Sequence, residues 1–134
     1  MSLKNNISIL WDGHTSGELT SESCTEGDIA LLDEFLDSLE SGSIKAAEKK
    51  SEEWVANSWV KHGILLNFSL RKKHPIVYGD IVYNDILPIA DTSDFSQRGI
   101  RNTPAATVIR RGVHIGSNAI LMSPCFVNIG ASIG

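Results

Sequence analysis

The sequence has few cysteines, and the two it has, Cys24 and Cys125, lie far apart in different segments. This spacing predicts neither a disulfide framework nor a metal site. No apolar run approaches the roughly 18 residues that a membrane span needs. Positive charge is not in excess either, since 12 lysines and arginines stand against 16 acidic residues. We therefore expect a reduced, cytoplasmic protein that holds no metal and binds neither nucleic acid nor membrane.

What the sequence does contain is a six-residue repeat from Ile109 to Gly134. An aliphatic residue stands at every sixth position, and a small or compact residue follows each of the first four after four positions. The aliphatic set is Ile109, Ile115, Leu121, Val127 and Ile133; the small set is Val113, Ala119, Cys125 and Ala131. This period fits neither an amphipathic helix nor an alternating strand. It is typical of a left-handed parallel β-helix, in which about eighteen residues make one three-sided coil.

The N-terminal part predicts two helices. Thr25 is a suitable N-cap, with Glu26 and Asp28 in the first turn, and Gly42 is a suitable stop. Between them lies one apolar stripe, formed by Ile29, Leu32, Phe35, Leu36 and Leu39. A second helix is expected from Asn57 or Ser58. Alternating apolar residues near its end leave a strand there as an open alternative.

Short extended segments complete the prediction. Residues 44–49 and 54–55 read as a hairpin, residues 76–83 as a strand broken by Gly79, and residues 86–89 as a further extended piece. The apolar patch from Ile7 to Trp11 is compatible with a short strand or a short helix. The predicted architecture is an α/β N-terminal domain over residues 1–105, followed over residues 106–134 by the first coils of a left-handed parallel β-helix.

Three segments resemble one known family. They are the tryptophan and helix segment from Trp54 to Phe68, the segment Gly99–Ala106 that enters the repeat, and the coil Ile120–Ala131. Together they look like the tetrahydrodipicolinate N-succinyltransferases. The likeness runs from about Gly42 to the end of the chain, and we find none in residues 1–24.

The resemblance implies a hexapeptide-repeat acyltransferase of lysine and diaminopimelate biosynthesis. Members of that family are homotrimers whose active sites lie in grooves between neighbouring prisms. Succinyl-CoA is the co-substrate, and its succinyl group passes to an amino group derived from a cyclic dicarboxylate. The implied chemistry is direct attack helped by a carboxylate base, with no bound cofactor and no acyl-enzyme.

One site residue follows from the resemblance. Arg101 matches the family arginine that contacts a substrate carboxylate, although Ile100 stands where the family usually has an aromatic residue. A guanidinium is permanently charged and grips a carboxylate through two parallel hydrogen bonds. The alternative is an arginine that pairs with a neighbouring acid. The family's catalytic aspartate and glutamate are expected beyond Gly134, so no catalytic residue is assigned within the chain.

Two alternatives remain open. Another hexapeptide acyltransferase could use His114 as its base, although an exposed residue on the outer face is the simpler interpretation of His114. A truncated oligomerisation module would share the fold without acting on succinyl-CoA. Because the repeat stops in mid-coil at Gly134, we expect an N-terminal portion of a larger enzyme or a shortened gene product, inactive by itself.

Overall fold

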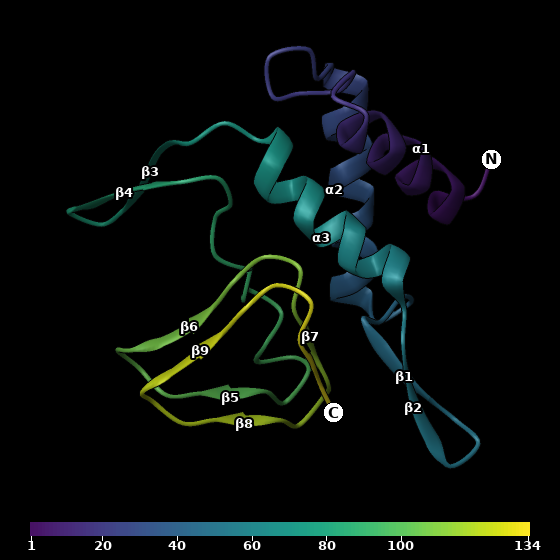
Figure 1. The fold of residues 1–134 in the computed structure, drawn as a ribbon. Helices are drawn as coiled ribbons and strands as arrows, with labels where there is room; N and C mark the ends of the chain where they lie inside the picture. The colour runs from purple at the N-terminus through teal and green to yellow at the C-terminus, as the bar shows by residue number, and fades with distance from the viewer.

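The computed structural model describes residues 1–134 as three helices beside a coil of short strands (Figure 1). The helices are α1 (Leu3–Thr15), α2 (Glu26–Ser41) and α3 (Ser58–Leu70). None of them is long and apolar enough to cross a membrane. The chain is therefore a mixed helix and strand structure.

Helix α2 begins and ends as its capping residues predict. The Thr25 hydroxyl accepts from the Asp28 backbone N–H, and the Asp28 carboxylate accepts from the Thr25 N–H at 2.8 Å. This reciprocal pair is a capping box, which satisfies two backbone donors at the first turn. Gly42 ends the helix with φ of 78°, a left-handed conformation that favours glycine. The prediction for this helix is confirmed.

The other two helices settle the open alternatives. The patch from Ile7 to Trp11 is helical, because it forms the middle of α1, whose Ile7 and Leu10 are buried. Helix α3 continues to Leu70, so the alternative of a strand near its end is wrong. One face of α3, formed by Val60, Gly63, Leu66, Asn67 and Leu70, is buried at helical spacing.

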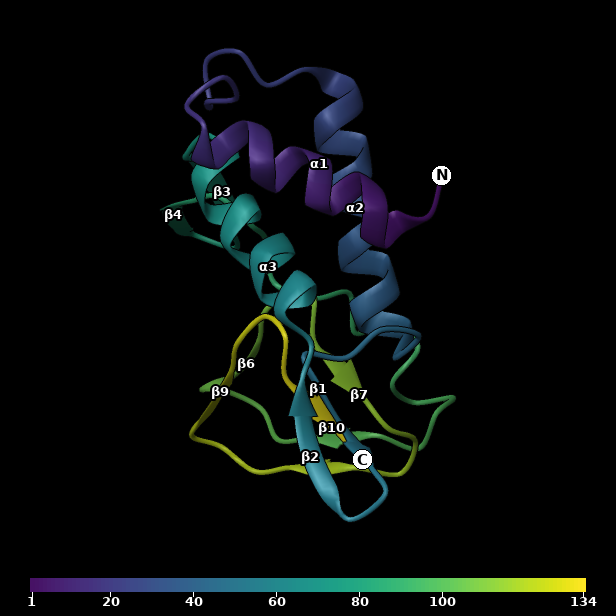
Figure 2. The ribbon, with the colours of Figure 1, turned by 45° about the vertical axis from the view of Figure 1, so that its right-hand side comes forward.

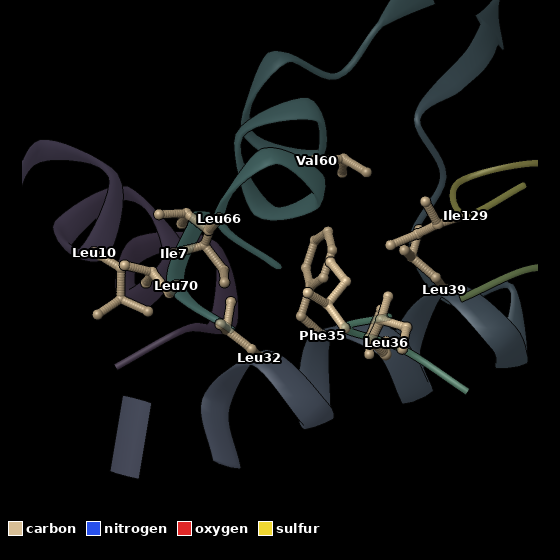
Figure 3. Packing of buried hydrophobic residues seen from close by; sticks show 12 residues of the cluster. Ile7, Leu10, Leu32, Phe35, Leu36, Leu39, Val60, Leu66, Leu70 and Ile129 are labelled. Atoms are coloured by element: carbon tan, nitrogen blue, oxygen red, sulfur yellow. The ribbon is translucent and has the colours of Figure 1, made fainter. Parts of the chain in front are cut away.

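The first core lies where α1, α2 and α3 meet (Figure 3). Phe35 of α2 is fully buried at its centre and lies directly over Gly63, where any side chain on α3 would collide with the ring. Ile129 enters the same cluster from the coil, close to Leu39 in the figure. The helices and the coil therefore share part of one apolar core.

Two antiparallel hairpins leave the helices. Strand β1 (Ala47–Lys50) pairs with β2 (Glu53–Ala56), as the sequence predicts. Strand β3 (His74–Tyr78) pairs with β4 (Ile81–Asp85), so the interruption at Gly79 is a tight turn with φ of 59°. The extended segment 86–89 that follows has two buried side chains, Ile86 and Leu87.

Six short strands build the coil in three parallel pairs. Strand β5 (Arg101–Asn102) pairs with β8 (Ile120–Leu121), β6 (Thr107–Ile109) with β9 (Cys125–Val127), and β7 (His114–Ile115) with β10 (Ser132–Ile133). Thr107 pairs with Cys125 and His114 with Ser132. In β6–β9 and β7–β10 the partner lies 18 residues further along the chain, and in β5–β8 it lies 19 residues further, from Arg101 to Ile120.

The repeat positions form a second core inside this coil. Ile109, Ile115, Leu121 and Val113 are buried, and the other aliphatic and small repeat positions pack against them half-buried. Cys125 is one of these half-buried residues and has a free thiol. Phe95 and Ile100, which precede the repeat, are also buried in this cluster. Phe95 is the one apolar residue of the segment 91–98, and it belongs to this core.

Candidate functional site

Arg101 lies on β5, exposed on the outside of the coil. Its backbone N–H donates to the Ala119 carbonyl oxygen at 2.9 Å, and Ile120 is its neighbour on β8. It is the only arginine of the chain without a carboxylate within 4.0 Å. The other four, Arg71, Arg98, Arg110 and Arg111, pair with Asp33, Asp94, Asp85 and Asp37. The guanidinium of Arg101 is therefore available to an external carboxylate.

Ile100, the departure from the family motif, points the other way. Its side chain is buried in the coil core, and its N–H donates to the Phe95 carbonyl oxygen at 2.9 Å. A side chain at position 100 therefore lies inside the coil, whereas the Arg101 side chain lies outside it. The aliphatic replacement therefore changes the packing of the coil interior.

A groove of about 590 Å³ opens beside Asn102, the residue after Arg101. The β3–β4 hairpin forms one wall through Tyr78 and Tyr83, and the coil forms the other through residues that include Phe126. The Tyr78 hydroxyl accepts from the Ile89 N–H at 2.7 Å, which fixes this ring. No motif in the sequence predicts this groove. The only signal was the pair of aromatic residues in the segment 76–83.

Arg110 also lines the groove, but its guanidinium already has partners within the chain. Its Nη2 lies 2.7 Å from Asp85 Oδ2, and its guanidinium lies 5.1 Å from the centre of the Phe68 ring. Its Nη1 reaches Asn128 Oδ1 at 3.4 Å. These contacts join α3, the end of β4 and the coil. Arg110 therefore positions the walls of the groove and does not offer a free charge.

A second set of contacts fixes the C-terminal end of α2 on the coil. The Glu40 carboxylate accepts from the Gly112 N–H at 2.8 Å, and Arg111 Nη2 lies 2.6 Å from Asp37 Oδ1. Arg111 Nη1 is buried without a hydrogen-bond partner. This junction could not be predicted from the sequence, because charged residues separated by more than seventy positions leave no local pattern.

His114 belongs to the same junction. Its Nδ1 lies 2.8 Å from the Glu40 carbonyl oxygen, and its half-buried ring packs against Gly42. It is therefore not the exposed outer-face residue that the sequence suggested. The hydrogen bond selects the tautomer that carries its proton on Nδ1, which leaves Nε2 as an acceptor.

The remaining histidines have structural contacts of their own. His62 stacks on Trp11 with 4.2 Å between ring centres, and His14 Nδ1 lies 3.1 Å from the Leu19 carbonyl oxygen. Both are half-buried. His74 is exposed at the start of β3. No three His, Cys, Asp or Glu side chains come together in a way that could hold a metal ion.

Two ionisable groups have shifted pKa values. Burial raises the pKa of the Cys24 thiol, and the nearby Asp28 carboxylate raises it further, against a smaller opposing effect of Arg71. Hydrogen bonds from the backbone N–H and side chain of Ser93 lower the pKa of Asp91, which is fully exposed.

Residues 2–70 match the family described as Tetrahydrodipicolinate N-succinyltransferase N-terminal. The chain belongs to this family. Three similar proteins are 2,3,4,5-tetrahydropyridine-2,6-dicarboxylate N-succinyltransferases. The Ralstonia nicotianae protein is 41% identical over 76% of the chain and 38% of its own length. The Pasteurella multocida protein is 33% identical over 99% of the chain and 48% of its own length. The Pseudoalteromonas translucida protein is 38% identical over 96% of the chain and 47% of its own length.

The resemblance seen in the sequence is thereby confirmed, with one correction. The family match begins at residue 2, so the likeness to the tetrahydrodipicolinate N-succinyltransferases extends into the segment 1–24, where the sequence analysis found none. Helix α1 lies within the matched residues and packs on α2 and α3 in the shared core. The chain spans less than half the length of these relatives.

Proposed function

We propose that the chain forms part of a succinyl-CoA-dependent N-succinyltransferase that acts on tetrahydrodipicolinate in lysine and diaminopimelate biosynthesis. Its membership of the tetrahydrodipicolinate N-succinyltransferase family is the observation that carries this proposal. The acceptor amine attacks the succinyl thioester directly, a carboxylate base takes its proton, and CoA leaves as the thiol. No bound cofactor takes part. We assign the base to the part of the relatives that the chain does not cover, since it spans less than half of their length, and we expect no turnover from residues 1–134 alone.

Arg101 binds a carboxylate of the dicarboxylate substrate. The support is its exposure together with its lack of an ion pair, since every other arginine of the chain already has one. A bidentate pair fixes both the position and the orientation of a carboxylate. Asn102 and the groove beside the β3–β4 hairpin continue from this point.

The coil is the beginning of a left-handed parallel β-helix. Three parallel strand pairs and an interior filled at every sixth residue support this proposal. The proposed division places residues 1–105 in the N-terminal domain and residues 106–134 in the β-helix. Strand β5, at Arg101, then reaches from the first part into the coil.

The enzyme is a cytoplasmic homotrimer that assembles through the outer faces of the coil. Large apolar side chains on those faces are exposed, namely Val108, Ile120, Met122 and Phe126. Monomeric proteins rarely leave such side chains together in water, and an interface would cover them.

A chimeric enzyme tests the proposed activity. Residues 1–134 replace the matching half of the Pasteurella multocida relative, and CoA release is followed with succinyl-CoA and the dicarboxylate. We expect turnover by the chimera and background rates for residues 1–134 alone. An inactive but folded chimera, or clear turnover by the isolated chain, would contradict the proposal.

Substitution of Arg101 in the chimera tests its role. Arg101→Lys keeps the charge but not the two-pronged geometry, so we expect KM for the dicarboxylate to rise about tenfold or more with KM for succinyl-CoA unchanged. Lys73→Gln is the matched control, since Lys73 is an exposed cation without an ion pair. Equal effects of the two substitutions would remove Arg101 from the site.

A second candidate is acyl transfer to another acceptor with His114 as base. The observation in its favour is the hydrogen bond to the Glu40 carbonyl oxygen, which orients the ring and leaves Nε2 free. His114→Gln in the chimera separates the candidates. Loss of the acidic limb of the pH–rate profile supports a histidine base, and an unchanged profile excludes it. A non-catalytic oligomerisation module predicts association of the isolated chain and an inactive chimera.

A further inference from the structure

A second groove, of about 1000 Å³, lies on another side of the molecule. It is bounded by the β1–β2 hairpin, the start of α1 and the last strand of the coil. Figure 2 shows β1 and β2 crossing in front of β10. The side chains that concern us here are Lys4, Lys45, Lys49, Lys50, Trp54 and Ser132.

The groove is positively charged although the chain as a whole is not. Four lysines line it against a single acidic residue, Glu48, in a chain of net charge −4. Lys50 pairs with Glu48 at 3.3 Å, and Lys49 with Glu52 at 3.4 Å, in exposed contacts that a ligand can displace at small cost. Lys4 and Lys45 have no carboxylate within 4.0 Å.

Trp54 adds a free aromatic surface to this charge. It is 73% exposed and stands directly across the β1–β2 ladder from Lys49. The other two tryptophans have ring partners, since Trp11 stacks on His62 and Trp59 meets Phe35 edge-on at 6.2 Å. Trp54 has no ring partner in the structure. An exposed tryptophan beside lysines is suited to a ligand with a planar ring and a negative group.

We propose that this groove binds a nucleoside phosphate. The base stacks on Trp54, and Lys4, Lys45 and Lys49 neutralise the phosphates, with the Ser132 hydroxyl as a further donor. This groove shares no lining residue with the groove beside Asn102, and binding of ADP to it requires no acyl transfer. The same chemistry is offered by a free nucleotide such as ADP and by the nucleotide end of CoA.

Calorimetric titration of residues 1–134 with ADP at low ionic strength tests the proposal. We expect saturable binding with one site per chain, weakened by added salt. Trp54→Ala should weaken it about five- to tenfold while Trp54→Phe largely retains it, because phenylalanine keeps a stacking face. Lys45→Gln should weaken it several-fold, and Lys73→Gln, which removes an exposed lysine outside the groove, should leave it unchanged.

Further ligands distinguish the parts and the source of the nucleotide. Adenosine tests the ring without the charge, inorganic phosphate tests the charge without the ring, and each should bind more weakly than ADP. Tighter binding of adenosine 3′,5′-bisphosphate than of ADP assigns the groove to CoA, and the reverse order assigns it to a free nucleotide. Absence of saturable ADP binding, equal loss in Lys73→Gln and Lys45→Gln, or insensitivity to Trp54→Ala would overturn the proposal.

Discussion

Arg111, which follows β6, forms a 2.6 Å ion pair with Asp37 of α2 across 74 residues of sequence. Arg111 Nε also lies 3.8 Å from Glu40, whose carboxylate holds the Gly112 N–H. These contacts fix the coil that carries Arg101 against the helices. Their loss should therefore weaken the joint between the two parts of the chain.

We expect Arg111→Met to lower the free energy of unfolding by about 1–2 kcal/mol, because a partly buried, hydrogen-bonded charge pair is removed. Lys72→Met is the control, since Lys72 pairs with Glu22 at 2.9 Å where both side chains are exposed. That change should cost about 0.5 kcal/mol or less. Urea unfolding measures the free energy of unfolding of both variants. Equal decreases would show that the contacts of Arg111 with α2 stabilise the chain no more than an exposed ion pair does.

Gly63→Ala should be strongly destabilising. A methyl group at this position would collide with the Phe35 ring inside the helical core, so ring or helix must move. Overpacking of this kind costs about 1–3 kcal/mol. Gly27→Ala in α2 is the matched control, because its nearest neighbour is the Thr25 Oγ1 at 3.6 Å. There we expect a stabilisation of up to about 1 kcal/mol from helix propensity. Thermal unfolding of both variants checks the contrast.

Leu121 and Ile120 are adjacent on β8, and truncation should destabilise the chain much more at Leu121 than at Ile120. Leu121 is 7% exposed in the coil core, whereas Ile120 is 62% exposed outside it. Leu121→Ala should cost about 2–4 kcal/mol, since it leaves a cavity, and Ile120→Ala about 0.5 kcal/mol or less. Chemical unfolding of the isolated chain at low concentration avoids a contribution from association. A larger loss for Ile120 would contradict the assignment of the inward positions.

Cys24 should be alkylated slowly in the folded chain. Burial and the Asp28 carboxylate disfavour its thiolate and raise its pKa, so at any pH below that value less of the reactive form is present. The pH profile of iodoacetamide labelling should have a higher midpoint in buffer than in urea. Asp28→Asn should move the midpoint down. Mass spectrometry of the Cys24 peptide distinguishes it from Cys125, and coincident profiles would contradict the shift.

Features that depend on neighbouring residues could be predicted from the sequence, whereas contacts between distant segments could not. Thr25 and Gly42 fixed the limits of α2 because capping depends on neighbouring backbone groups. The six-residue spacing located Ile109, Ile115 and Leu121 in one core. The short patch from Ile7 to Trp11 was ambiguous, since only its packing on the other helices decides that it is helical.

The candidate site was predictable in part. The motif pointed to Arg101. The sequence could not show that Arg101 lacks an ion pair while the other four arginines each have one, because those pairs are set by the fold. Phe95 and Ile100 fill the coil without belonging to its repeat, so periodicity could not identify them. His114 was misread because its contact with Glu40 comes from an element far away in sequence.

The separation of Asp37 and Arg111 has a consequence for synthesis. A ribosome adding about 5–20 residues per second needs roughly 4–15 seconds to make the chain between them. During that interval the end of α2 is complete while its cationic counterpart does not yet exist. In the nascent chain the Asp37 carboxylate therefore has no Arg111 to pair with until the later residues are made.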